Sequence, residues 1–150
     1  MNIGNVQVDP PVVLAPMAGI TNHAFRLICR EFGAGLVSTD MISSCGIHYR
    51  NQRTLGMFDW TDEECPVAVQ IFGAEPGVMA DAAALVEEAG ADIVDINVGC
   101  PVRKVRKTGA GAGLIEDLDT ARRIMESVVK AVKIPVTIKT RKGLDDRHAS

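Results

Sequence analysis

Short runs rich in β-branched residues alternate along this chain with longer segments whose apolar residues recur at helical spacing. The short runs predict strands at residues 12–15, 35–38, 67–72, 92–97 and 136–141. The longer segments predict helices at residues 21–33, 41–50, 75–89 and 118–132, the first of them with Thr21 as its N-cap. Strand and helix repeated in this way predict right-handed βαβ units and therefore a parallel sheet.

The predicted strands have one apolar face and one mixed face, because side chains alternate along a strand. In the third strand Val67, Val69 and Ile71 share the apolar face, which suits packing under helices. The mixed faces of the last three strands carry a polar residue toward their carboxyl ends, namely Gln70, Asn97 and Lys139. A face of this kind is typical of the interior of a (β/α)8 TIM barrel, whose active site lies at the carboxyl ends of the strands.

The chain is short for such a barrel. A complete barrel has eight strands and needs about 200 residues or more, whereas this chain has 150 residues. We therefore expect an α/β fold that forms the N-terminal portion, about five strands, of a TIM barrel, incomplete in this chain. The open first and last strands would present unpaired backbone groups, so we expect the chain to self-associate through its sheet edges.

Composition limits the possible functions. The net charge of −3 has the wrong sign for a general nucleic-acid binder, so RNA contacts must come from a local patch or from sequence outside this chain. The first residues lack the basic and apolar regions of a secretory signal, and no apolar run approaches the ~18 residues that span a membrane. We expect a cytoplasmic protein that does not associate with membranes.

The four cysteines lack metal-ligand spacing, so no metal site is expected, and a reducing cytosol disfavours disulfides. Cys29, Cys45 and Cys65 are expected to act as small buried apolar residues. Cys100 differs, because it follows a predicted strand on the glycine-containing turn Asn97-Val-Gly-Cys-Pro101. This position favours an exposed and reactive thiol.

Two charged or flexible features follow this turn. Four positive charges fall within five residues, at Arg103, Lys104, Arg106 and Lys107, and on charge alone they fit a solvated loop as well as a binding surface. The glycine-rich segment 108–113 comes next, without the Lys-Ser/Thr pair of a P-loop and without a strand directly before it. Its glycines are expected to let a mobile loop fold close over a ligand.

In order and spacing, the motifs of this chain resemble those of the tRNA-dihydrouridine synthase family. The resemblance covers essentially the whole chain, and the closest branch is the bacterial one that includes the B-type enzymes. Its most specific part is the Asn-x-Gly-Cys-Pro motif together with the Gly-Ala-Gly-Ala loop. The matching segments are Leu14-Ala-Pro-Met-Ala-Gly-Ile-Thr21 with Phe25-Arg26; Gln70-Ile-Phe-Gly73; Asp95-Ile-Asn-Val-Gly-Cys-Pro101 with Lys104-Val105 and Gly109-Ala-Gly-Ala112; and Val136-Thr-Ile-Lys139 with Arg141 and Gly143.

The resemblance implies a flavin enzyme that reduces specific uridines in tRNA to 5,6-dihydrouridine. FMN would be the cofactor, and NADPH or NADH the reductant. By the same resemblance, Pro16, Met17 and Gln70 would contact the flavin ring. Lys139 would lie near the N1–C2 edge of the ring, where a fixed cation stabilises the anionic reduced flavin.

The resemblance also implies how the substrate is held. Asn97 and Arg141 would bind the target uracil, which must leave its stack to enter the barrel mouth. Hydride would pass from flavin N5 to uracil C6, and Cys100 would donate the proton that C5 requires. The tRNA phosphates would pass the basic residues Arg103, Lys104, Arg106 and Lys107.

One position of this chain differs from the family pattern, and other family features are expected outside these 150 residues. Asn22-His23 replaces the Asp that often follows the first motif. The flavin phosphate site, a later histidine near the ring and a C-terminal helical tRNA-binding domain are expected in further sequence. His23, His48 and His148 do not replace that later histidine and are expected at the surface.

Two other functions stay open. One is an FMN-dependent barrel that reduces a free pyrimidine, and the other is an inactive truncated fragment. The basic residues 103–107 favour tRNA over a free base, since a free base needs no phosphate contacts.

Overall fold

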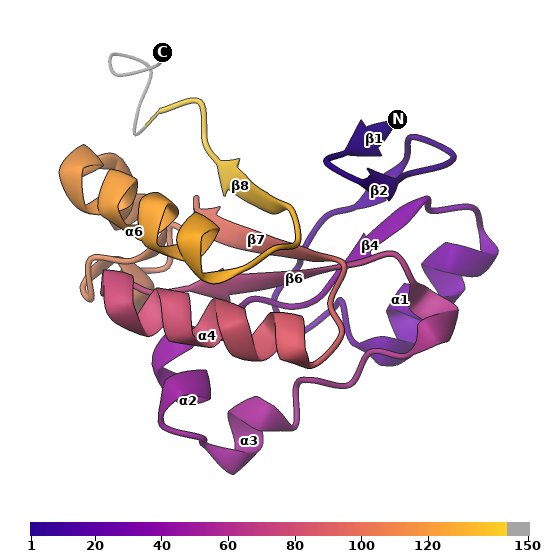
Figure 1. Cartoon of the computed structure of the whole chain (residues 1–150), viewed down its shortest axis with the longest axis horizontal. Coiled ribbons are helices and arrows are strands. Elements are labelled where there is room, and N and C mark those ends of the chain that lie inside the picture. Colours follow the sequence, from indigo (N-terminus) through magenta and orange to yellow (C-terminus); the bar gives the residue numbers. More distant parts are fainter. Residues whose placement is uncertain (144–150) are drawn as a thin grey trace.

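The computed structural model describes residues 1–143, and at its centre a parallel sheet has main strands that follow one another in chain order (Figure 1). These strands are β3 (Val13–Leu14), β4 (Leu36–Ser38), β6 (Val67–Phe72), β7 (Ile93–Val98) and β8 (Val136–Thr140). All neighbouring pairs among them are parallel. A curled parallel sheet in chain order is the beginning of a (β/α)8 barrel, so the predicted fold class is confirmed.

Three longer helices pack against the strands: α1 (His23–Glu31), α4 (Pro76–Glu88) and α6 (Leu118–Ala131). The largest core cluster joins the apolar faces of β6 and β7 to α4 and α6. Its members include Val69, Ile71, Val94, Ile96, Met79, Val86, Ile124 and Val128. The apolar strand face therefore packs under helices, as the alternation predicted, and the mixed face is left for the barrel interior.

The helix starts follow capping chemistry. The side chain of Asn22 accepts a hydrogen bond from the backbone N–H of Phe25 at 3.0 Å, so Asn22, and not the predicted Thr21, is the N-cap of α1. The Thr21 hydroxyl is buried and instead bonds the backbone of Met17 at 3.2 Å. Asp117 caps α6 by accepting from the Thr120 N–H at 3.0 Å.

The segment predicted as one helix at residues 41–50 is divided between several elements. A short strand, β5 (Ile42–Ser43), pairs with the end of β6, and α2 (Ser44–His48) follows directly with Ser43 as its N-cap. The helix α3 (Gln52–Leu55) and the 3-10 helix η1 (Asp62–Glu64) complete the stretch before β6. The single-helix prediction was therefore wrong, because Ile42 and Ser43 pair with β6 as a strand and Ser43 then caps a helix that begins only at Ser44.

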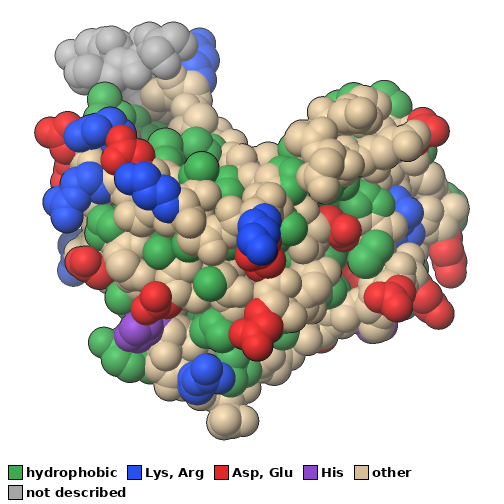
Figure 2. Space-filling model, in the orientation of Figure 1, with side chains coloured by type: hydrophobic (Ala, Val, Ile, Leu, Met, Phe, Trp, Pro, Cys, Tyr) green, Lys and Arg blue, Asp and Glu red, His purple; other side chains and the backbone are tan. Residues whose placement is uncertain are grey.

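An N-terminal hairpin, which the sequence did not predict, lies across the sheet from its C-terminal strand. Its strands are β1 (Asn2–Ile3) and β2 (Val6–Gln7), joined in an antiparallel pair. Ile3 and Val6 pack on a cluster formed by Val8, which follows β2, and by three residues near the beginnings of β4, β6 and β7, namely Leu36, Ala68 and Ile93. The molecular surface is hollowed between this hairpin and β8 (Figure 2), where a cavity of about 290 Å³ reaches from Ile3 to Thr137.

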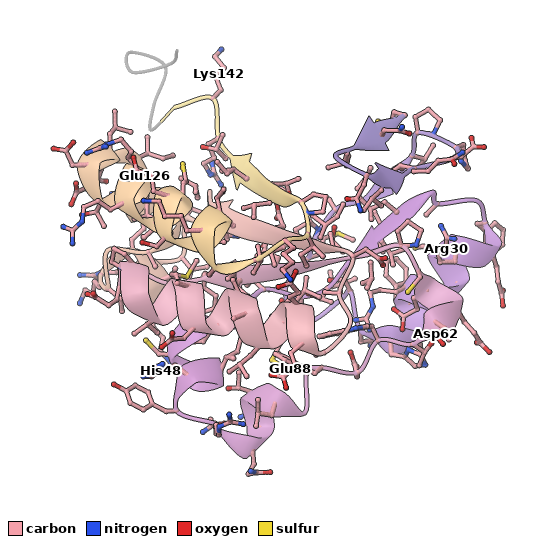
Figure 3. The ribbon with its side chains drawn as sticks, viewed as in Figure 1. Arg30, His48, Asp62, Glu88, Glu126 and Lys142 are labelled. Atoms are coloured by element: carbon pink, nitrogen blue, oxygen red, sulfur yellow. The ribbon has the colours of Figure 1, made fainter. Side chains whose placement is uncertain are left out.

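A buried ion-pair cluster fastens α1 to the segment that precedes β6. The Arg26 guanidinium contacts both oxygens of the Glu64 carboxylate, and its NH2 group also donates to Asp59 at 2.8 Å. The His23 ring bonds Glu64 at 2.5 Å. Arg30 adds a bond to the Cys65 carbonyl at 2.8 Å, and Arg30 and Asp62 lie at the same end of the molecule (Figure 3).

No helix within residues 1–143 is long and apolar enough to cross a membrane. The same described range contains no group of three or more His, Cys, Asp and Glu side chains that could hold a metal ion.

Candidate active site

A pocket of about 320 Å³ opens at the carboxyl ends of the parallel strands. It brings together six of the residues singled out in the sequence, from four different strands or the loops that follow them: Pro16, Gln70, Asn97, Cys100, Lys139 and Arg141. Residues to which the sequence analysis gave no role in the site complete the wall: Ala18, Met41, Gly99, Pro101, Val102 and Thr140. The pocket lies where active sites of (β/α)8 barrels are found.

Strand register explains why these side chains meet. Gln70 of β6 lies opposite Asp95 of β7, and Asn97 of β7 lies opposite Lys139 of β8. Because side chains two residues apart share a face, Asp95 and Asn97 both point inward, next to Gln70 on one side and Lys139 on the other. The polar inward face predicted from the alternation therefore exists as one continuous surface.

The polar groups on this face form a connected network. Gln70 Nε2 donates to Asp95 Oδ2 at 2.5 Å, and the Thr137 hydroxyl donates to Asp95 Oδ1 at 2.6 Å. Asn97 Nδ2 donates to Gln70 Oε1 at 2.8 Å. Thr39 supplies a further tie, since its hydroxyl accepts from the Gln70 backbone N–H at 3.2 Å. Every buried side-chain oxygen and nitrogen in the described residues has a partner.

The turn that carries Cys100 is held from three sides. Asn97 Oδ1 accepts from the backbone N–H of Cys100 at 3.0 Å and of Gly99 at 3.3 Å. Arg141 Nε donates to the Gly99 carbonyl at 2.7 Å. On the far side the Ala112 N–H donates to the Cys100 carbonyl at 3.0 Å.

The glycine-rich segment packs behind this turn. It forms the 3-10 helix η2 (Gly111–Ile115), in which Gly111 has a φ of +60°. A Cβ at Gly111 would lie 2.9 Å from the Cys100 carbonyl oxygen, so a side chain there would displace the turn. The glycines thus allow a close approach to Cys100, and the expected loop over a ligand is replaced by a buried support.

The loop after β3 forms another part of the pocket wall. Pro16 and Ala18 line the pocket, whereas Met17 is half-buried and is not among its lining residues. Asp40 ties this loop to the next one, because its carboxylate accepts from the Gly19 and Met41 backbone N–H groups, each at 2.7 Å. Nothing in the local sequence pattern pointed to Met41 or to Asp40.

The basic residues lie beside the pocket rather than in it. Arg103, Lys104 and Arg106 form most of the short helix α5 (Arg103–Arg106), and Lys107 is its C-cap. All four side chains are exposed, and the buried Val105 lies against the glycine-rich segment at Gly111. Arg106 pairs with Glu116. Since Val102, the residue before the helix, lines the pocket, this basic surface adjoins the pocket rim.

The other cysteines, His23 and His48 lie away from the pocket. Cys29 and Cys65 are partly buried, whereas Cys45 is exposed on α2, which corrects its expected burial. Burial, together with the nearby Asp92 carboxylate, raises the pKa of the Cys65 thiol to about 11. His23 pairs with buried Glu64, and His48 pairs with Asp81 at 3.0 Å. His148 lies outside the described residues.

Comparisons with known proteins agree with this architecture. The family model described as dihydrouridine synthase (Dus) matches residues 13–150. The tRNA-dihydrouridine synthase B of Xanthomonas campestris is 43% identical over 148 residues, which cover 99% of this chain and 45% of that protein. The protein of the same name from Escherichia coli K12 is 42% identical and is covered to 46% of its length, and a probable tRNA-dihydrouridine synthase of Rickettsia typhi is 44% identical and is covered to 45%.

The chain thus spans about half the length of the curated relatives it matches. The match extends through every strand of the parallel sheet and includes the pocket residues at the strand ends. The chain belongs to the dihydrouridine synthase family.

Proposed function

We propose that this chain forms part of the active site of an enzyme that reduces uridines in tRNA to 5,6-dihydrouridine with a flavin cofactor. The observation that carries the proposal is the convergence of Gln70, Asn97, Cys100, Lys139 and Arg141 on one pocket at the barrel mouth. The relatives are named as tRNA-dihydrouridine synthases, which supports the reaction and its tRNA substrate. The remaining barrel units, the flavin phosphate site and a helical tRNA-binding domain would lie outside these residues.

The pocket residues fit a flavin ring, which is planar and carries carbonyl oxygens and ring nitrogens along one edge. Lys139 lines the pocket, and within residues 1–143 no salt bridge engages its ammonium group. Gln70 Nε2 has a second N–H beyond the one it donates to Asp95. Pro16 and Ala18 add an apolar wall. Lys139 would hold positive charge beside the ring, and this charge favours its reduced form.

When bound and reduced, FMN would supply the hydride to uracil C6, and NADPH or NADH would reduce the flavin again. The role of this chain in the reaction would be to hold the base and to deliver a proton. Cys100 would donate its thiol proton to C5, where negative charge builds as C6 is reduced. Arg141 uses Nε to fix the Gly99 carbonyl, which leaves its remaining N–H groups for the uracil. Asn97 would contribute mainly by orienting the turn that carries the thiol.

The proposal is tested by replacing Cys100 with Ala in a longer protein that carries this chain and the remaining barrel. Flavin content and reduction by NADPH should stay near normal, because neither needs the thiol. Reoxidation of the reduced flavin by unmodified tRNA should slow by roughly 10²–10⁴-fold, the usual contribution of a positioned general acid. Anaerobic stopped-flow mixing measures this step.

The exposed Cys45 provides the matched control, since Cys45→Ala removes a thiol that does not line the pocket and should reoxidise at the parent rate. A Cys100→Ala protein as fast as Cys45→Ala would mean that another group supplies the proton. The role of Cys100 would then have to be abandoned.

A second candidate substrate is a free pyrimidine, and the exposed basic helix α5 favours tRNA over it. Replacing Arg103, Lys104, Arg106 and Lys107 by Gln should weaken tRNA binding and flatten its salt dependence, by up to about one unit of slope for each lost phosphate contact. Replacing the same number of exposed charges on and after α6, at Arg122, Arg123, Lys130 and Lys133, is the control. Equal salt slopes for both quadruple variants, measured by filter binding, would leave α5 as a solvated surface and favour the free base.

A further inference from the structure

One carboxylate in the barrel interior is linked to the backbone of the Cys100 turn through two side-chain amides. We propose that Asp95 is a positioning residue, which acts through Gln70 and Asn97 to hold the turn that presents Cys100. The link runs from Asp95 to Gln70 at 2.5 Å, from Gln70 to Asn97 at 2.8 Å, and from Asn97 to the Cys100 N–H at 3.0 Å. The value of this turn for catalysis rests on the proposed function.

The two ends of this link determine the orientation of both amides. An ionised carboxylate only accepts hydrogen bonds, so Gln70 must turn its Nε2 toward Asp95 and its Oε1 toward Asn97. At the other end the backbone N–H groups of Gly99 and Cys100 only donate, so Asn97 must turn Oδ1 toward them and Nδ2 toward Gln70. Each amide has one orientation that satisfies both neighbours, and the two orientations agree.

The three linked side chains are buried, and this strengthens their dependence on one another. The exposed fractions are 1% for Gln70, 7% for Asp95 and 8% for Asn97, so water cannot readily replace a lost partner. All three residues lie on paired central strands, where register fixes the distances between their backbones. A change at Asp95 should therefore reach the turn through side-chain orientation, while the strands stay in place.

These hydrogen bonds would hold the turn that carries Cys100 in one geometry. Small displacements of a catalytic group slow a reaction strongly, since about 1 Å of misplacement can cost roughly 10²-fold in rate. Asp95 would not touch the substrate, because it does not line the pocket that holds Cys100. Its part would be to keep Gln70 and Asn97 from turning, and so to keep the Cys100 N–H bound to Asn97.

The test is amide hydrogen exchange on the full chain without cofactor or tRNA, followed residue by residue by NMR. In Asp95→Ala the Gly99 and Cys100 amides should exchange about tenfold faster, since their acceptor is no longer held. Asp95→Asn keeps one oxygen for Gln70 and should restore most of the protection. Thr137→Val is the matched control, because it removes the other hydrogen bond of Asp95 and leaves the link to Gln70 intact.

A double-mutant cycle shows whether Asp95 acts through Gln70. If it does, Asp95→Ala adds little to the faster exchange already present in Gln70→Leu. Additive effects, unchanged exchange at Cys100, an Asp95→Asn chain as fast as Asp95→Ala, or equal acceleration at core amides of α6 such as Val128 would each overturn the proposal. The cofactor-free readout also separates this proposal from the catalytic role of Cys100, which the reoxidation experiment tests.

Discussion

Two buried polar networks in this chain are built from different groups. The Arg26 cluster pairs opposite charges, with Arg26 1% and Glu64 0% exposed, and joins α1 to the segment before β6. The network of the site has a carboxylate at one end and amides between it and the Cys100 turn. Charge-assisted hydrogen bonds are roughly twice as strong as neutral ones, whereas amides in series, each with one donor and one acceptor end, transmit orientation. The comparison indicates that the first network fastens the fold and the second shapes the site.

The largest effect should come from breaking the charge pair. Arg26→Met leaves Glu64 buried without its guanidinium partner, which typically costs about 3–5 kcal/mol of unfolding free energy. Urea denaturation followed by circular dichroism measures the loss. Arg122→Met is the matched control, because Arg122 pairs with Glu126 on the exposed side of α6 at 2.9 Å, and its loss should cost no more than about 0.5 kcal/mol.

Since a loss of this size can unfold a marginally stable domain, a second variant keeps the comparison decisive. Adding Glu64→Gln to Arg26→Met removes the unpaired charge and should recover part of the lost stability. Equal losses for Arg26→Met and Arg122→Met would show that the buried pair contributes no more than a surface pair. The conclusion that the Arg26 cluster stabilises the fold would then be wrong.

The sequence predicted the site better than it predicted this cluster, and the reason is the range of the interactions. Gln70, Asn97 and Lys139 follow from a two-residue alternation within strands, and strand register then brings them together. Arg26 and Glu64 are 38 residues apart, and no local period links them. Glu64 lies in the polar stretch before β6, where charges without periodicity suggest a solvated loop.

Asp95 is an intermediate case. The alternation of β7 puts it on the same inward face as Asn97, but the sequence pattern alone could not tell that Gln70 and Thr137 would both donate to it. The N-terminal hairpin was missed for a related reason, since each of its strands has only two residues. A strand that short carries no readable alternation, and its stability comes from packing on residues distant in sequence.

The smallest effect that sharpens the comparison concerns the cysteine next to the Arg26 cluster. Cys65 directly follows Glu64, and burial and the Asp92 carboxylate raise the pKa of its thiol to about 11 from the ordinary 9.0. A thiol whose pKa is raised by folding contributes stability below pH 9.0, and this contribution is lost as pH rises through about 11. We expect a gradual loss of stability across that range.

Alkylation measures the same shift directly, because the thiolate is the reacting form. Iodoacetamide treatment with peptide mapping should give a Cys65 rate that keeps rising to a pH of about 11, well beyond the pH at which an unshifted thiol levels off near 9.0. The exposed Cys45 of the same chain serves as the internal reference and should react much faster at pH 8. Cys65→Ser should remove the alkaline loss of stability. If Cys65 instead reacts as fast as Cys45 at pH 8, the segment that carries Glu64 opens readily, and the Arg26 cluster does not fasten it.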